Sequence, residues 1–303
     1  MEFTTGVVAN GFLIIVSVMD YFRTPSFGPS SIILGSLGLT RFGFQCALII
    51  SNILPFLLSD STRQGKGSQT FIVLWMFLNF SSLWCATWLC VYYCVKIANF
   101  TNRAFSFLKL RFSKLLPFLL LGSLLVSLAF SLPLCMDIKI FGNMNKTFSQ
   151  NNTVPAFIAN INYSSWSLLC TLGSLMPFSL FWLAAALLNI SLRRHTLRIK
   201  GSDMGGFRNP SIMAHCRAVG IMIVFFLFYA SFVAAVNVSA SGILCKESLQ
   251  SFLCEVVISA YPSLHSLALI LSNSKLREAA FRALPCATSI SRPGELQVSS
   301  IFP

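Results

Sequence analysis

Seven long apolar stretches, separated by short polar connections, account for most of the chain. They run over residues 3–22, 30–58, 70–95, 115–136, 166–192, 218–244 and 252–274. Each holds the roughly 20 apolar residues that a helix needs to cross the hydrocarbon core of a bilayer. Because a backbone in lipid must satisfy its own hydrogen bonds, this pattern predicts an all-α fold, a bundle of seven transmembrane helices.

The basic residues collect on alternate connections. Sixteen of the 22 Lys and Arg residues lie on one set of connections, five lie on the opposite set, and Arg41 lies inside the second stretch. Lys and Arg close to the ends of transmembrane helices are retained on the cytoplasmic side. The N-terminus is therefore predicted outside and the C-terminus inside. Since Glu2 precedes the first stretch and Arg23 follows it, we expect an uncleaved first span rather than a signal peptide.

Composition leaves no room for a second, soluble domain. The chain of 303 residues is 55% hydrophobic and only 10% charged, so we expect one membrane domain over 1–303. Residues 275–303 are expected to form a cytoplasmic tail that begins with a short amphipathic helix. A net charge of +13 on cytoplasmic loops suits the anionic lipid of that leaflet. Membrane lipid is therefore an expected partner, and nucleic acid is not.

The connection 137–165 carries three glycosylation sequons on the predicted outer side, headed by Asn145, Asn151 and Asn162. It contains no cysteine, and neither do residues 68–75, so the disulfide that joins these elements in many seven-helix receptors cannot form. Cys245 and Cys254 flank the last outer connection. They could form a disulfide or remain two thiols, and the sequence supports both interpretations equally.

Arg41 lies deep in the second stretch, too far from the inner end to reach water easily. The sequence places no acidic residue at a comparable depth, so neutral acceptors must satisfy the guanidinium. We expect them to be Asn10 and the polar part of the last stretch around His265, Ser266 and Asn273. Two interpretations fit: a structural link among three helices, or a polar network whose partners change on activation.

The inner end of the third stretch carries the most distinctive motif, LWCATWLCVYYCVKIANFTN at residues 83–102. This run resembles the third helix of the type 2 (bitter) taste receptors. Further matches to that family follow in order along the chain. They are Asn10-Gly11-Phe12, Leu37 through Arg41, Pro177-Phe178, His215, AYPSLHS at 260–266 and LILSNSKLR at 269–277.

The resemblance implies a G-protein-coupled receptor at the plasma membrane that binds small bitter compounds in the outer half of the bundle and needs no cofactor. Trp75 and Asn79 are expected to share one inward helical face, because an Asn exposed to lipid is costly. The matching positions of the family line the ligand cavity. The ligand-binding residues that the resemblance implies in this chain are Trp75, Met76, Asn79, Tyr229, Phe232, Val236, Glu255 and Ile258.

Glu255 begins the last stretch at its outer end, and two roles fit it. It could reach water at the interface, or it could face the cavity and pair with a protonated amine. Pro177 and Pro262 fall inside the fifth and seventh stretches, where each removes a backbone hydrogen bond and permits a kink. These kinks are either static or hinges that carry a binding event to the inner end of the bundle.

The resemblance also implies a gustducin-type heterotrimeric G protein as the partner on the cytoplasmic side. The residues expected to face it are Tyr93, Lys96, Arg103, Lys109 and His215. Whether the receptor forms an oligomer is left open by the sequence. A transporter or channel would need polar residues through several spans, and no catalytic motif of a membrane enzyme occurs. A retinal receptor is not expected either, because the last stretch has no Lys for a Schiff base.

Overall fold

The computed structural model describes residues 2–23, 28–57, 61–98, 103–133, 163–202, 210–243 and 248–290. Within these ranges the regular structure is entirely helical. The helices are α1 (Glu2–Arg23), α2 (Pro29–Leu57), α3 (Ser61–Ile97), α4 (Arg103–Ser131), α6 (Tyr163–Ser202), α7 (Pro210–Ala240), α8 (Leu249–Ser272) and α9 (Ser274–Ile290). Seven of them, all except α9, are long and apolar enough to cross a membrane, which confirms the predicted seven-helix bundle.

Local sequence signals mark several helix ends. Pro29 and Pro210 are the first residues of α2 and α7, where a proline costs no hydrogen bond and its fixed φ suits the helix. Ser248 caps α8, because its side chain accepts a hydrogen bond from the Ser251 backbone N–H at 3.2 Å. Beyond the end of α7, Gly242 has φ 69°, a left-handed conformation that glycine adopts without steric cost.

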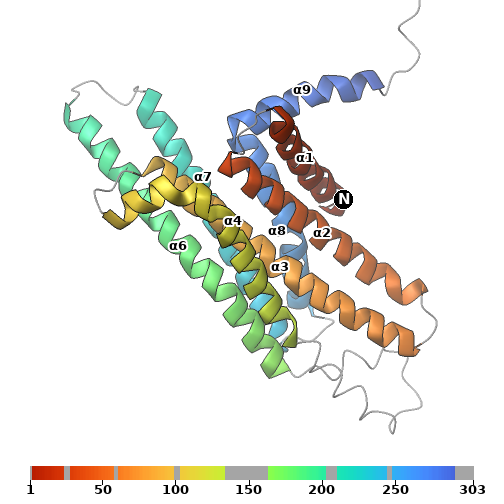
Figure 1. Cartoon of the computed structure of the whole chain (residues 1–303). Coiled ribbons are helices and arrows are strands. Elements are labelled where there is room, and N and C mark those ends of the chain that lie inside the picture. The colour runs from red at the N-terminus through yellow and green to blue at the C-terminus, as the bar shows by residue number, and fades with distance from the viewer. Residues whose placement is uncertain are drawn as a thin grey trace, which may run out of the picture.

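Helix α3 runs through the middle of the bundle and packs against α2, α4 and α6 (Figure 1). The ring is completed by α1 against α2 and α8, and by α7 against α6 and α8. Glycines permit close approach at two of these contacts. A Cβ at Gly173 of α6 would lie 2.6 Å from the Phe80 ring of α3, and one at Gly38 of α2 would lie 3.0 Å from the Asn10 carbonyl of α1.

Helix α4 begins at Arg103, well before the apolar stretch expected at 115–136. The preceding segment is basic and amphipathic, with Phe112 buried while Arg111 and Lys114 are exposed, and Leu116 one turn later is buried on the same side. A hydropathy pattern detects only the part of a helix that lies in lipid. Helices α3 and α6 likewise extend beyond their apolar stretches, starting at Ser61 and ending at Ser202 respectively.

Candidate functional site: a buried arginine and an aromatic cluster

Arg41 on α2 is fully buried, and its guanidinium bonds two neighbouring helices. Its Nε donates to the Ser82 hydroxyl of α3 at 3.2 Å. Its Nη1 donates to the Ser266 hydroxyl of α8 at 3.0 Å, and its Nη2 to the Tyr261 hydroxyl at 3.3 Å. The guanidinium carbon also lies 5.2 Å from the centre of the Tyr261 ring, a cation–π distance. The planar guanidinium group of Arg41 therefore joins α2 to α3 and α8.

A chain of hydrogen bonds continues from this arginine toward α1. The Ser266 hydroxyl donates to Asn10 Oδ1 at 2.7 Å, and Asn10 Nδ2 donates to Gln45 Oε1 at 3.3 Å and to the Gly6 carbonyl at 2.8 Å. Gln45 Nε2 then donates to the Ser263 hydroxyl at 2.9 Å. We call Asn10, Arg41, Gln45, Ser82, Tyr261, Ser263 and Ser266 the polar network. All its members are buried.

The expected partners of Arg41 are confirmed in part. Ser266 bonds it directly, while Asn10 reaches it only through Ser266. The Asn273 oxygen is not a partner, because it accepts from the Lys275 backbone N–H at the end of α8. His265 is not a hydrogen-bond partner either. Its ring stacks on Tyr261, with centroids 5.6 Å apart.

Four members of the network were not anticipated: Gln45, Ser82, Tyr261 and Ser263. Gln45 carried a usable signal, because an amide one helical turn from Arg41 in an apolar span must be satisfied inside the bundle. Ser82, Tyr261 and Ser263 carried no such signal, since serine and tyrosine are common in membrane helices. Their role depends on how α3 and α8 are rotated about their axes.

Tyr261 also anchors a cluster of aromatic rings between α6, α7 and α8. Its ring centre lies 4.5 Å from that of Phe232 and 6.3 Å from that of Tyr229. Tyr229 in turn meets the rings of Phe178 and Phe181 of α6 edge-on, at 5.3 and 4.9 Å. The structure therefore brings two of the expected ligand residues, Tyr229 and Phe232, into direct packing with a residue that bonds Arg41.

The expected ligand residues of α3 lie on its inward side. Met76 and Asn79 are buried, and Trp75 is half-buried with its ring 5.6 Å from that of Phe44 on α2. The indole Nε1 of Trp75 and the amide Nδ2 of Asn79 are buried without a hydrogen-bond partner among the described residues. Buried donors of this kind are costly unless something accepts from them.

The remaining expected ligand residues divide between the core and the surface. Val236 of α7 and Ile258 of α8 are buried, and Ile258 lies one turn before Tyr261 on the same side of α8. Glu255 is exposed. It lies on α8 one turn before the buried Ile258.

A second polar contact, between α6 and α7, was missed by the sequence analysis. Asn237 Oδ1 accepts from the Thr171 hydroxyl at 2.6 Å, and its Nδ2 donates to the Ser174 hydroxyl at 3.3 Å and to the Val233 carbonyl at 2.8 Å. Asn237 follows Val236 directly. An Asn within an apolar span was the available signal.

Near the aromatic cluster, a side chain of α3 forms a hydrogen bond with the proline of α6. The Thr87 hydroxyl donates to the Pro177 carbonyl at 3.0 Å and to the Leu83 carbonyl of its own helix at 2.9 Å. Pro177 and Pro262 both lie inside continuous helices, as predicted. A side chain of the central helix thus bonds the backbone of α6 at Pro177.

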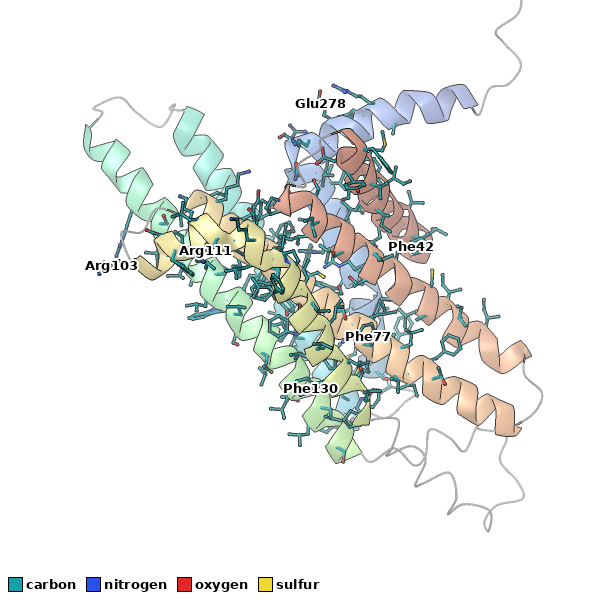
Figure 2. The ribbon with its side chains drawn as sticks, viewed as in Figure 1. Phe42, Phe77, Arg103, Arg111, Phe130 and Glu278 are labelled. Atoms are coloured by element: carbon teal, nitrogen blue, oxygen red, sulfur yellow. The ribbon has the colours of Figure 1, made fainter. Side chains whose placement is uncertain are left out.

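The expected G-protein-facing residues lie near the ends of α3, α4 and α7. Tyr93 is half-buried and interacts with the Asn273 side chain, while Lys96, Arg103 and Lys109 are exposed. Lys96 Nζ lies 5.6 Å from the centre of the Tyr92 ring, and Lys109 Nζ donates to the Ala98 carbonyl at 3.5 Å. Arg103 and Arg111 lie on α4 away from Phe130, toward the end of the bundle that carries α9 and Glu278 (Figure 2). His215 belongs to α7, but its side chain lies outside the described part.

Several predictions fall outside the described residues, namely the sequons at Asn145, Asn151 and Asn162 and the cysteine at Cys245. In the part of the chain that the structure describes, no three His, Cys, Asp or Glu side chains lie together as metal ligands would. The single ion pair there is Arg282 with Glu278. Arg41 therefore has no carboxylate partner among the described residues.

Comparison with known proteins agrees with the motifs. Residues 1–288 match the family model described as taste receptor protein (TAS2R). The human taste receptor type 2 member 2 is 36% identical over 285 residues, which cover 94% of this chain and 93% of that receptor. Member 39 from Macaca mulatta is 34% identical, covering 92% of this chain and 82% of that receptor. Member 7 from Pongo pygmaeus is 31% identical, covering 98% and 94%.

Proposed function

Because the chain belongs to the TAS2R family of taste receptors, we propose that it binds small bitter organic compounds in the outer half of its helix bundle and activates a gustducin-type G protein. The family makes it a chemosensory membrane receptor rather than an enzyme. The assignment of a ligand cavity is supported by the residues described above, and that of a gustducin-type G protein is supported by the resemblance to the family.

The buried donors of α3 are the observation that carries the ligand site. Trp75 Nε1 and Asn79 Nδ2 are buried with no acceptor among the described residues. A ligand carbonyl, ether or hydroxyl oxygen would satisfy them, while Met76, Phe232, Val236 and Ile258 would supply apolar contact. Such a site, with few polar groups in an apolar lining, recognises many shapes with modest affinity.

The polar network supports a route from this site to the inner end of the bundle. Phe232 packs on Tyr261, and Tyr261 bonds Arg41, which also bonds α3 through Ser82. A ligand that shifts Phe232 or Tyr229 would also move the ring of Tyr261, whose hydroxyl accepts a hydrogen bond from Arg41. The proposed contact with the G protein lies at the inner end and consists of Tyr93, Lys96, Arg103, Lys109 and His215.

The decisive experiment compares signalling with ion flux in cells that express the whole chain. Bitter compounds are expected to release calcium only when a promiscuous G protein is supplied, and to produce no ion current without it. Asn79→Ala is expected to weaken the response about tenfold, because one ligand hydrogen bond is lost. Ser231→Ala is the matched control, since that exposed hydroxyl bonds only the carbonyl of Phe228 in its own helix. An agonist-evoked current without G protein would contradict the proposal.

Glu255 is proposed to favour cationic agonists as they enter. Its carboxylate is exposed at the start of α8 and could attract a protonated amine at the mouth of the cavity. Glu255→Gln is expected to raise the half-maximal concentration of a cationic agonist severalfold and to leave that of a neutral agonist unchanged. Equal sensitivity of both variants to both compounds would refute this role.

The receptor is placed in the plasma membrane with its N-terminus outside, where Asn145, Asn151 and Asn162 would meet the glycosylation machinery. Membrane lipid is its surrounding partner, and self-association stays an open question. Treatment with an endoglycosidase would reveal the glycans as a loss of mass in the purified receptor.

A further inference from the structure

Helix α9 leaves the bundle directly at the end of α8, with only Asn273 between them. It packs against α8 and α1 and runs across the end of the bundle rather than along it (Figure 1). Because α8 is a membrane span, the first turns of α9 lie where the hydrocarbon core gives way to lipid headgroups. The side chains of these turns are therefore at the depth of phosphate groups.

Two faces of α9 differ in chemistry. Leu276 is buried and Ala280 half-buried against the bundle. Ser274, Arg277 and Phe281 follow one another at spacings of three and four residues, which places them on a second, common face. Phe281 is 63% exposed, too much for a ring that packs within the protein. This face therefore presents a hydroxyl, a guanidinium and a free aromatic ring.

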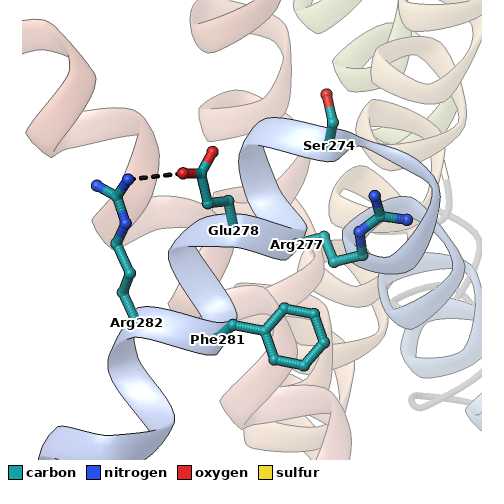
Figure 3. Close-up of a pocket in the computed structure, with 5 residues that line it drawn as sticks. All are labelled: Ser274, Arg277, Glu278, Phe281 and Arg282. Atoms are coloured by element: carbon teal, nitrogen blue, oxygen red, sulfur yellow. Dashed lines mark hydrogen bonds and ion pairs between the residues drawn. The ribbon is translucent and has the colours of Figure 1, made fainter.

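These three residues line a hollow of about 630 Å³ together with Glu278 and Arg282. Glu278 is engaged by Arg282 at 2.6 Å, and Arg277 projects away from this pair (Figure 3). Arg277 adds a further positive charge to the lining, and Lys275 adds one in the same turn outside it. Among the lining residues one carboxylate, Glu278, faces two cations, Arg277 and Arg282, so the hollow carries a net positive charge.

We infer that this hollow binds the phosphate of an anionic membrane lipid. Arg277 would donate paired hydrogen bonds to the phosphate oxygens and Ser274 a third, as guanidinium and hydroxyl groups do at phosphate sites. Phe281 would enter the acyl region beside the headgroup, where aromatic rings are favoured. The inference rests on the membrane placement of the receptor, but it requires neither an agonist nor a G protein.

The test uses the full-length receptor purified in a neutral detergent and titrated with short-chain phosphatidylinositol 4-phosphate, with binding followed by thermophoresis. Arg277→Gln is expected to weaken binding about fivefold, the loss of one cation near a lipid phosphate. Glu278→Gln is expected to strengthen binding, because it removes the one acidic group of the hollow. Phe281→Ser should weaken binding of the lipid and leave binding of free inositol phosphate unchanged.

Arg111→Gln is the matched control, because Arg111 is also exposed near the end of the bundle and also lies over a phenylalanine, 5.0 Å from the centre of the Phe107 ring. It is expected to leave binding unchanged. Equal losses for Arg277→Gln and Arg111→Gln would overturn the inference, since they would reflect only total charge. Equal binding by all variants, or free inositol phosphate that binds as tightly as the lipid, would overturn it as well. A failure of bitter agonists to signal would leave this result unaffected.

Discussion

At Gly6 the lack of a side chain makes room for the amide of Gln45. A Cβ at this position would lie 1.7 Å from Gln45 Nε2 and 2.3 Å from the Ser263 hydroxyl. Gly6→Ala is therefore expected to displace the Gln45 amide and break its bonds to Asn10 and Ser263. The cost is about 2 kcal/mol of stability, because buried polar groups lose their partners. Thermal unfolding of the purified receptor would measure it as a lower midpoint.

Gly11 of the same helix supplies the control. A Cβ there meets nothing within 4 Å, so Gly11→Ala is expected to leave the unfolding midpoint unchanged or to raise it slightly through better helix propensity. If both alanine variants unfold at the temperature of the unmodified receptor, the close packing at Gly6 has no energetic importance.

Arg41 is expected to be the most sensitive position of the polar network. Arg41→Ala leaves the hydroxyls of Ser82, Tyr261 and Ser266 without their donor and opens a cavity between three helices. A loss of about 3 kcal/mol is expected, together with loss of signalling. Unfolding of the purified variant and agonist-evoked calcium release would measure the two effects.

Arg41→Lys separates the two interpretations of this residue. Lysine keeps the charge but lacks the planar fork that reaches two helices at once. If Arg41 is only a structural link, Arg41→Lys should lower stability and leave basal signalling unchanged. If the network switches partners on activation, basal signalling should change in a variant that still reaches the cell surface. A fully active and stable Arg41→Ala would contradict both interpretations.

Individual residues were predictable from the sequence where burial leaves a single solution. Arg41 in an apolar span had to find neutral partners, and Ser266 was expected among them and is one. Tyr261 could not be predicted, because its hydroxyl meets Arg41 only through the rotation of α8 about its axis. The environment of Asn79 depends in the same way on the rotation of α3. Sequence periodicity in a membrane helix that is apolar on all sides specifies such rotations poorly.

Between elements, Asn237 is the polar contact that holds α7 to α6. Asn237→Ala removes the hydrogen bonds to Thr171 and Ser174 and is expected to cost about 1 kcal/mol, a common value for such bonds inside membranes. Because Val236 is its neighbour, the variant should also shift the half-maximal agonist concentration. Thermal unfolding and a dose–response curve would measure these effects.

Thr171→Val tests the same contact from the other helix. Its effect should not add to that of Asn237→Ala in the double variant, because both changes break one shared hydrogen bond. Fully additive effects would show that the two residues act independently and would contradict a shared hydrogen bond between α6 and α7.

The helices themselves were predictable from hydropathy because a span in lipid has few alternatives to a helix. The residues at which the helices begin and end were less predictable. The start of α4 at Arg103 lies in a basic, amphipathic segment whose order depends on burial of Phe112 and Leu116. The amphipathic helix expected after the last span is α9, but the exposure of Phe281 follows from how α9 packs on α8 and α1.

For the whole molecule, seven spans require the two termini to lie on opposite sides of the membrane. An epitope tag placed before residue 1 should bind antibody on intact cells, and one placed after residue 303 only on permeabilised cells. The excess of Lys and Arg on one set of connections gives the direction. Two tags accessible from the same side would contradict the topology.

The isolated guanidinium in the middle of the bundle also acts at a distance. Near the centre of the span Pro29–Ile50, Arg41 is a fixed positive charge with only neutral partners, in a medium that screens poorly. A protonated amine that entered the proposed ligand site would therefore meet repulsion that grows toward Arg41, whereas a neutral molecule would meet none. Alkaloid-like compounds would consequently stop farther from Arg41 than uncharged ones, and the two classes of stimulus would occupy different depths of the proposed ligand site.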